Sequence, residues 1–464
     1  MKKIGIAVSV VILLAISVLV AVTTLRRETP AGAEGSQTAR ETGGHFHDRK
    51  TDFSGYGWSI IPHTETALAN AIAAAEGDAS RATDLIMVYY THHHDPARIA
   101  KYFREKKGSK THVFGASSDF GVVASDGYHE SANGVIGLMS LKLSGARVGV
   151  GGADLDEVES PEACIALALR RAMEHAGATP GKDQPSMILM SCTYDGLEER
   201  IVSELTRQTG DAVPVLGGTS GGTAARGAED CSVIANDKVI RRGLTLCVWF
   251  TEKPVLWAFG GGFARTGKSG VVTRSDGREI WEIDNRPALD VYDEWSGGRL
   301  KEDMRAGVDM NKVTALYPLC RQVGAGETSR NLFIHAWPLA DGATSKRIVS
   351  SASLWKGDVI HFSEGSWNML LNRLGALSSQ ALGTVKRESV SAGFVICCEG
   401  VLKNIPDSQR DQIAQVINRT LGDVPWLGTF TWGEQGNFQG IGNFHGNLLM
   451  SVTLFPASET GSEK

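Results

Sequence analysis

The sequence predicts a fold between α/β and α+β, with repeated βαβ units and mixed sheets, because one unit recurs along the chain. Asp84–Val123 aligns with Ser186–Ala225 without a gap, and Phe394–Glu434 is a looser third copy. Each copy has an apolar run, a helix-like stretch and a second apolar run that ends in a glycine- and hydroxyl-rich turn. A strand, a crossover helix and a second strand form a βαβ unit, which is almost always right-handed.

The elements of the repeat follow from their composition. Short apolar runs bounded by polar residues indicate buried strands, and the polar stretches between them have helical composition. The expected elements are Leu85–Tyr90, Pro96–Lys107 and Val113–Asp119 in the first copy, Met187–Cys192, Glu198–Gln208 and Val215–Gly221 in the second, and Phe394–Cys398, Ser408–Leu421 and Pro425–Glu434 in the third.

Two further helices are signalled next to these copies. Thr64–Glu76 is rich in alanine, which favours a helix. Ser160 is a suitable N-cap, Pro161 then occupies the first helical position, and Gly177 follows the expected end.

Strands are expected where apolar runs flank turns. Val135–Leu143 and Ala146–Val150 are predicted to pair with each other around Ser144–Gly145. The rest of the ordered chain is expected to hold strands at 244–250, 255–259 and 448–455, antiparallel strands within 330–362, helices at 290–301 and 367–382, and a turn-rich junction at 260–290.

The N-terminus carries a membrane-anchor signal. Ile4–Leu25 is an apolar run without a charge, and as a helix it would span roughly 33 Å against a bilayer core of about 30 Å. Lys2–Lys3 precede it, and no small-residue cleavage pattern follows. We expect one transmembrane helix at 1–25 in the cytoplasmic membrane, with the folded part outside the cytoplasm; an exported chain with a cleaved signal is the alternative. Residues 26–54 are polar and are expected to be a flexible linker.

Bulk composition excludes some classes of function. The chain has 464 residues, which suits two or three domains, and a formal net charge of -5. A nucleic-acid-binding protein usually has a strongly basic face, so nucleic acid is not an expected partner. The seven cysteines are odd in number and show no disulfide-framework spacing.

One segment matches a nucleotide-binding pattern letter for letter. Gly262–Ser269 reads G-F-A-R-T-G-K-S, which fits the phosphate loop G-x-x-x-x-G-K-[ST]. That loop needs a helix to follow it, but Gly270–Ile283 is β-branched and is broken by the hairpin signal Asp276–Gly277. We interpret the match as a glycine turn, and a hydrolase that uses Lys268 and Ser269 remains the alternative.

Other reactive side chains favour structural interpretations. His92–Asp95 could offer imidazoles and a carboxylate to zinc, but consecutive residues cannot all point at one ion. Cys192 has no catalytic signature around it, and Cys397–Cys398 lie within an apolar run. No catalytic residue, metal or cofactor is therefore predicted.

The turns that end the repeats are the preferred ligand site. In parallel sheets, ligands bind outside the carboxyl ends of the strands. Hydroxyls and free backbone N–H groups there can bind a carboxylate, and acidic residues can bind an ammonium, so an amino acid is a suitable ligand. The alternative is that the hydroxyls only cap turns. The candidate ligand-binding residues are Ser117, Ser118, Asp119, Thr219, Ser220, Thr429, Thr431 and Glu434.

The chain resembles the FIST domain proteins (F-box and intracellular signal transduction). The resemblance rests on V-F-G-A-S-S-D-F-G-V-V at 113–123, V-L-G-G-T-S-G-G at 215–222, V-V-T-R-S-D-G-R-E-I-W-E-I-D-N-R-P-A-L-D-V-Y at 271–292 and L-G-D-V-P-W-L-G-T-F-T-W-G-E at 421–434. It implies a two-part body, with a FIST N-terminal domain at 55–285, a FIST C-terminal domain at 286–456 and a tail at 457–464.

The resemblance also implies a sensory module that binds a small ligand and is not an enzyme. The chain departs from the family pattern because it shows no kinase, methyl-accepting or cyclase output. We therefore expect a membrane-anchored bacterial protein that captures a small, amino-acid-like metabolite and signals through a partner protein. An enzyme and a protein-docking scaffold are the alternatives.

Overall fold

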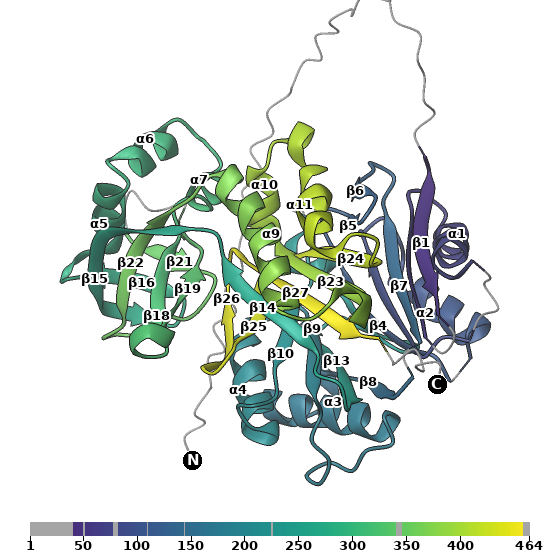
Figure 1. Ribbon diagram of the computed structural model, residues 1–464. Coiled ribbons are helices and arrows are strands. Elements are labelled where there is room, and N and C mark those ends of the chain that lie inside the picture. Colours follow the sequence, from purple (N-terminus) through teal and green to yellow (C-terminus); the bar gives the residue numbers. More distant parts are fainter. Residues whose placement is uncertain are drawn as a thin grey trace, which may run out of the picture. The chain divides into compact units, whose positions relative to one another are not determined.

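A computed structural model describes residues 40–49, 52–77, 82–108, 110–142, 144–223, 226–339 and 346–457 (Figure 1). Residues 41–464 form one compact unit. The fold is a mixed α/β arrangement of several mixed sheets, as the sequence predicts. Within it the repeat is larger than the βαβ unit, because each copy consists of a first strand, a helix, a βαβ unit, a hairpin and a closing strand.

The elements of the three copies correspond one to one. The first comprises β2 (Phe53–Ser59), α1 (Thr64–Glu76), β3 (Leu85–Tyr90), α2 (Pro96–Lys106), β4 (His112–Ser117) and β7 (Ile136–Lys142). The second comprises β8 (Ala146–Asp154), α3 (Pro161–His175), β9 (Met187–Cys192), α4 (Glu198–Thr209), β10 (Val215–Thr219) and β13 (Gly243–Thr251). The third comprises β14 (Leu256–Gly261), α9 (Trp367–Leu382), β23 (Val390–Cys398), α10 (Glu399–Asn404), α11 (Gln412–Leu421), β24 (Trp426–Thr431) and β27 (Leu449–Pro456).

The hairpin of each copy joins the sheet of a different copy. β5 (Val122–Ala124) and β6 (Gly127–His129) extend the third sheet beside β24, while β11 (Val233–Ala235) and β12 (Lys238–Ile240) extend the first beside β4. β25 (Glu434–Phe438) and β26 (Gly442–Gly446) extend the second beside β10. β1 (Thr42–Asp48) is the remaining edge of the first sheet. The three sheets are therefore interlocked in a ring, and each is completed by residues distant in sequence.

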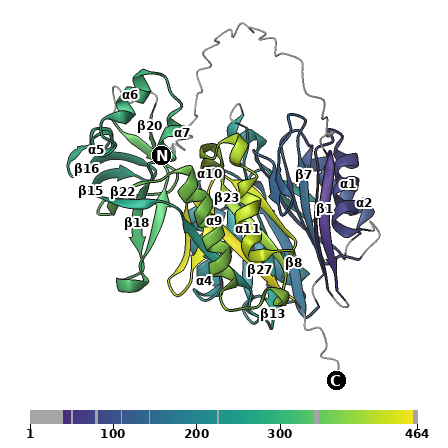
Figure 2. The ribbon, with the colours of Figure 1, turned by 45° about the horizontal axis from the view of Figure 1, so that its top comes forward.

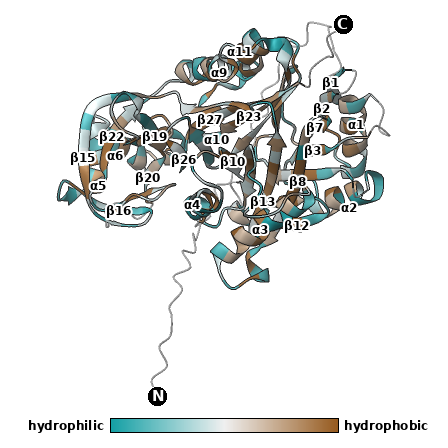
Figure 3. Cartoon of the chain, turned by 60° about the horizontal axis from the view of Figure 1, so that its bottom comes forward, coloured by the Kyte–Doolittle hydropathy of each residue, from teal (hydrophilic) through white to brown (hydrophobic). Residues whose placement is uncertain are grey.

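The inner faces of the three sheets enclose one hydrophobic core. Tyr89 of the first sheet stacks on Phe394 of the third with ring centroids 5.5 Å apart, and Trp249 of the second stacks on Phe455 at 4.6 Å. The outer faces are covered by helices, so the central strands are apolar on both sides. Figure 3 shows these brown strands between outer helices such as α1, α3 and α11.

A subdomain with its own core is inserted between β14 and α9 of the third copy. Figures 1 and 2 show it in green beside the three-sheet body. Its elements are β15 (Ala264–Asp276), β16 (Glu279–Ile283), β17 (Arg286–Pro287), α5 (Ala288–Trp295), α6 (Arg299–Arg305), α7 (Met310–Thr314), β18 (Leu319–Val323), β19 (Arg330–Ile334), β20 (Ala336–Pro338), β21 (Ile348–Ser350) and β22 (Val359–Glu364). They form an antiparallel sheet in the order β19-β18-β22-β15-β16-β21-β20.

Glycines let the first strand of a copy lie directly against its first helix. A Cβ at Gly57 in β2 would lie 2.0 Å from the backbone oxygen of Ala71 in α1. We expect Gly57→Ala to lower the free energy of unfolding by about 3 kcal/mol or more, because the helix must move away from the sheet. Gly267→Ala is the matched control, since nothing lies within 4 Å of its Cβ. Urea denaturation of both variants measures the difference, and equal midpoints would contradict the expectation.

Several predicted elements are confirmed. α1 spans the predicted residues, and the Ser160 hydroxyl accepts a hydrogen bond from Ala163 N at 3.2 Å at the start of α3. The predicted pairing of Val135–Leu143 with Ala146–Val150 is wrong. β7 pairs with β2 and β3 in the first sheet, whereas β8 pairs with β13 in the second. The turn between them links two copies of the repeat, so the flanking strands belong to different sheets.

The N-terminal expectations are tested only in part. The predicted helix at 1–25 lies outside the described residues, and so does most of the predicted linker. The linker boundary at residue 54 is wrong, because β1 already pairs with β2 over seven residues from Thr42 to Asp48. Within the described ranges, no helix is long and apolar enough to cross a membrane.

Candidate functional site

The three repeat-ending turns meet at one place in the structure. Gly221 N donates to Ser117 O at 3.0 Å, and the Ser117 hydroxyl donates to Gly221 O at 2.8 Å, which joins the first turn to the second. Thr219 N donates to Gly433 O at 2.8 Å, and Trp432 N donates to Thr219 O at 3.1 Å, which joins the second to the third. The turns lie together because they follow the carboxyl ends of equivalent strands.

Most of the predicted site residues are buried within this junction. The following side chains are at most 5% exposed: Ser117, Ser118, Thr219, Ser220, Thr429, Thr431 and Glu434. The Ser118 hydroxyl donates to Gly121 O at 2.8 Å, so it holds its own turn. The Ser220 and Thr429 hydroxyls have no hydrogen-bond partner among the described residues. Such groups are costly to leave unpaired, which fits a place where a small polar molecule binds.

Glu434 is a carboxyl group inside the protein. Its Oε1 lies 2.8 Å from the Thr431 hydroxyl, and its Oε2 accepts a hydrogen bond from Leu449 N at 3.1 Å. Burial raises its pKa to about 8, so Glu434 is mostly protonated at neutral pH. These contacts tie the third turn to β27.

Asp119 lies in a half-buried cluster of charged and aromatic groups. Glu399, at the start of α10, accepts hydrogen bonds from Trp432 Nε1 and from Lys403 Nζ, both at 2.6 Å. The ammonium of Lys403 lies 5.2 Å from the centre of the Phe120 ring. Trp432 meets Tyr194 edge to face with ring centroids 5.3 Å apart. The five side chains Asp119, Glu399, Lys403, Trp432 and Tyr194 are called the acidic cluster below.

The two carboxyl groups of the cluster are close enough to affect each other's ionisation. Burial and the adjacent Glu399 together raise the pKa of Asp119 to about 7, against the opposing effect of Lys403. Burial also raises the pKa of Glu399, against the opposing effects of Lys403 and Trp432. One lysine thus neutralises one of two adjacent carboxyl groups, and a second cation placed there would lower the pKa of Asp119.

A glycine lets the second turn lie directly against this cluster. A Cβ at Gly221 would lie 2.9 Å from Asp119 N and 3.6 Å from Trp432 Nε1. Any side chain at residue 221 would therefore collide with the first turn and cover the indole N–H. The equivalent residue in the first turn is Asp119 itself, so the three turns differ where they meet.

The cluster includes residues that sequence reasoning missed. Glu399 and Tyr194 follow the leading strands β23 and β9, and Lys403 lies one helical turn after Glu399. These residues escape a prediction based on glycine- and hydroxyl-rich turns, because such turns follow only the second strand of each repeat. The position after the first strand was the available signal, because both strands of a parallel pair end at the same edge.

A second charged cluster lies beside the first and joins the inserted subdomain to α4. Arg278 donates to Glu198 at 2.7 Å and to Glu199 at 2.8 Å, and Ser353 N donates to Glu199 at 2.7 Å. Glu198, Glu199 and His445 also have donor atoms within 4.8 Å of one another, as a metal site would require. The guanidinium of Arg278 already supplies the positive charge there, so this arrangement fits an ion-pair link better than a metal centre.

The alternative chemistry considered for this chain has no support in the geometry. Residues 264–269 of the phosphate-loop match belong to β15, a strand without the required helix after it. Lys268 contacts the carbonyl oxygen of Trp295 and faces the Phe362 ring. Cys192 is buried, and burial raises the pKa of its thiol well above the usual range, so its reactive thiolate is disfavoured. Burial keeps His94 neutral by lowering its pKa to about 4.

Comparisons with known proteins place the chain in a family. The FIST N domain model matches residues 84–286 and the FIST C domain model matches residues 288–437. No curated protein matches the chain. Among solved structures, a cyanuric acid hydrolase from A. caulinodans is similar with a TM-score of 0.31 and 10% sequence identity, covering 90% of this chain and 100% of its own. The two domain models together span most of the chain, which therefore belongs to the FIST family of generally sensory, ligand-binding proteins.

Proposed function

We propose that this protein is a sensor that binds a small metabolite carrying an ammonium group, such as an amino acid, at the acidic cluster. The observation that carries the proposal is the pair of carboxyl groups, Asp119 and Glu399, with Lys403 as their close counter-charge among the described residues. A ligand ammonium beside Asp119 would complete the charge balance. Lys403 would face the ligand's carboxylate, and Trp432 and Tyr194 offer aromatic surfaces to a cation or an apolar side chain.

The expected result is selective stabilisation of the protein by ammonium-bearing ligands. Thermal unfolding is measured with the common amino acids, with the corresponding amines and with the corresponding hydroxy acids. The comparison shows whether the ammonium group or the carboxylate of the ligand is responsible for the stabilisation. We expect amines to retain part of the effect and hydroxy acids to lose it, because the carboxyl pair needs a cation. A ligand at 100 times its dissociation constant would add about 2.7 kcal/mol to the free energy of unfolding.

Asp119→Asn tests the site itself, because it removes the charge and keeps the shape. We expect this variant to fold and to lose the response, whereas Asp211→Asn, in an exposed loop, keeps it. Binding to the unchanged protein should also strengthen about tenfold between pH 6 and pH 8, because Asp119 must lose its proton. Equal responses in both variants would refute the site.

Signalling requires a second protein in this proposal. The FIST parts account for residues 84–437, and FIST domains are generally sensory rather than catalytic. We propose that ligand binding changes the affinity for a partner protein. The inserted subdomain is the natural place for that partner, because Arg278 links it to α4 next to Tyr194 of the acidic cluster.

We also propose that residues 4–25 anchor the protein in the cytoplasmic membrane, with the folded part outside the cytoplasm. The support is the uncharged apolar run and the lysines before it. A C-terminal epitope tag should be accessible to antibody in cells with a permeabilised outer envelope and an intact inner membrane. The protein should stay with the membrane fraction in high salt. A tag that is protected until the inner membrane is broken would show the opposite orientation. A soluble full-length protein would contradict the proposed anchor.

A further inference from the structure

The inserted subdomain contains a break between two neighbouring strands. β18 and β22 pair only at Leu319 with Phe362 and at Cys320 with His361. Beyond that point β18 continues to pair with β19, and β22 continues to pair with β15. The next two pairs of the ladder would be Arg321 with Ile360 and Gln322 with Val359, and neither is formed. The two strands therefore separate at this point.

Main-chain groups of both strands face this break. Ser363 N donates to Pro318 O at 2.9 Å across the same two strands. In an antiparallel ladder the direction of the N–H and C=O groups alternates with a period of two residues. Counting from Pro318 and Ser363, the backbone groups of Gln322 and Val359 point toward each other, where no ladder pair joins them.

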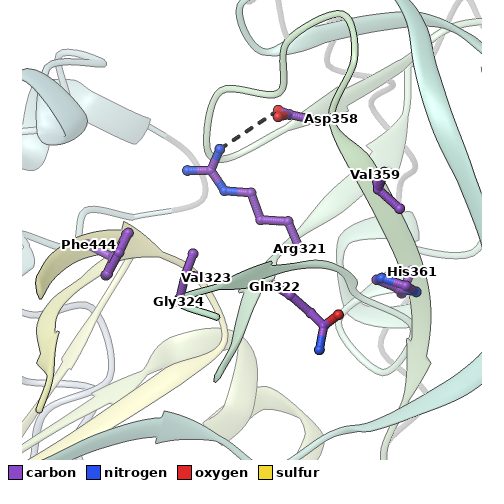
Figure 4. A pocket seen from close by; sticks show the side chains of 8 residues that line it. All are labelled: Arg321, Gln322, Val323, Gly324, Asp358, Val359, His361 and Phe444. Carbon is purple, nitrogen blue, oxygen red and sulfur yellow. Dashed lines mark ion pairs between the residues drawn. The ribbon is translucent and has the colours of Figure 1, made fainter. Parts of the chain in front are cut away.

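An open cleft of about 670 Å³ lies at the break. Figure 4 shows Arg321 and Gln322 leaving β18 in opposite directions, with Val359 and His361 on β22 and Phe444 of β26 across the opening. Free strand flanks of this kind accept an additional extended segment through main-chain hydrogen bonds.

The two faces of the cleft differ in chemistry. One face carries Arg321, whose Nε is buried and has no hydrogen-bond partner in the described part of the chain. Asp358 lies 3.7 Å from the guanidinium, but its Oδ2 already accepts a hydrogen bond from Trp355 N. Arg321 is therefore only loosely paired and can bind an incoming carboxylate.

The other face carries two exposed valines, with Gln322 and His361 beside them. Val359 is 51% exposed, and its cross-strand neighbour Val271 is 37% exposed. Cross-strand neighbours point to the same side of a sheet, so the two valines form one apolar surface. His361 lies on this face, where burial and Arg265 lower its pKa and so favour the neutral imidazole.

We propose that this cleft binds an extended segment of a partner protein in which acidic and apolar residues alternate. The main chain of the segment would hydrogen-bond to the free flanks at Gln322 and Val359. Its acidic side chains would face Arg321, and its apolar side chains would cover Val359 and Val271. The site is separate from the acidic cluster, and its occupancy does not depend on the ligand proposed above.

A short labelled peptide tests the proposal with the full chain. The probe is a capped, fluorescein-labelled hexapeptide of alternating valine and glutamate, followed by fluorescence anisotropy. Its matched control has the same composition in two blocks, three valines and then three glutamates. We expect the alternating peptide to bind about tenfold more tightly than the block peptide, because only alternation places each side-chain type on its own face. N-methylation of one internal amide of the alternating peptide should weaken binding to a similar degree.

Two protein variants locate the binding. Gln322→Pro removes the N–H that points into the break and leaves the hydrogen-bonded pairs with β19 intact. Arg321→Gln removes the positive charge. Both should weaken binding of the alternating peptide about tenfold, whereas Arg274→Gln, exposed on β15 of the same sheet, should not. If Gln322→Pro unfolds, the N-methylated peptide replaces it as the test of main-chain bonding.

Three results would overturn the proposal. If no peptide binds up to millimolar concentration, the cleft is not a peptide-binding site. Equal binding of the alternating and block peptides would show that the peptide does not bind as an extended strand. Competition by free glutarate as effective as by the unlabelled peptide would show a pocket for small acids instead of a segment of a protein.

Discussion

Neither half of the chain is expected to fold when it is produced alone. Residues 41–286 contain β5, β6 and β14, which belong to a sheet whose other strands β23, β24 and β27 lie in the second half. The second half contains β25 and β26, which complete the sheet of β9 and β10 in the first. Each half would expose apolar strands and open sheet edges, which favour aggregation.

Circular dichroism and thermal unfolding measure this expectation. Residues 41–286 and residues 287–457 should each lack a cooperative transition, and co-expression should restore a soluble complex with one transition. Residues 264–362 produced alone are the control and should show a transition, because the sheet and the hydrophobic cluster of the inserted subdomain are formed largely within that range. A cooperative transition in residues 41–286 alone would show that the interlocked hairpins are dispensable.

The repeat could be predicted from the sequence because its central strands are apolar on both faces. Leu85–Tyr90 and Met187–Cys192 lie between helices and the shared core, so they read as uninterrupted apolar runs. The exchange of hairpins could not be predicted. β5 and β11 have three residues each, too few for a periodic pattern, and β5 pairs with β24, about three hundred residues away in the chain.

The meeting of the three turns could be predicted from the sequence, but the surroundings of their side chains could not. The turns after β4, β10 and β24 meet as expected, yet most of their hydroxyls are buried and bonded within the junction. Among the predicted site residues, Asp119 is the one whose charged group is only half-buried. A sequence cannot show which side of a turn faces a cavity, so Glu434 and Asp119 looked alike although only Glu434 is fully buried. A ligand role for the buried hydroxyls and Glu434 stays a prediction.

Replacing Glu434 with glutamine is expected to make the protein more stable in alkaline solution. The pKa of Glu434 is raised from 4.5 to about 8 by burial, and a shift of one pKa unit corresponds to about 1.4 kcal/mol. Between pH 4.5 and about pH 8 the unfolded chain releases this proton while the folded protein keeps it, so the fold loses a few kcal/mol of stability by about pH 8. Glu434→Gln keeps the two contacts of the protonated form, with its amide N–H toward Thr431 and its oxygen toward Leu449 N.

The sign of the effect follows from proton linkage. The folded protein binds the Glu434 proton more tightly than the unfolded chain, so this group stabilises the fold fully below pH 4.5, and the stabilisation is lost as the pH rises through about 8. Melting temperatures of the wild type and Glu434→Gln should therefore diverge from pH 5 to pH 9, with the variant higher at pH 9. Asp119→Asn is the control, because the pKa of Asp119 is about 7 and its effect should level off at lower pH. Parallel curves for the wild type and Glu434→Gln would mean that Glu434 is ionised in the fold, and the carboxyl group would then have to be paired with a cation.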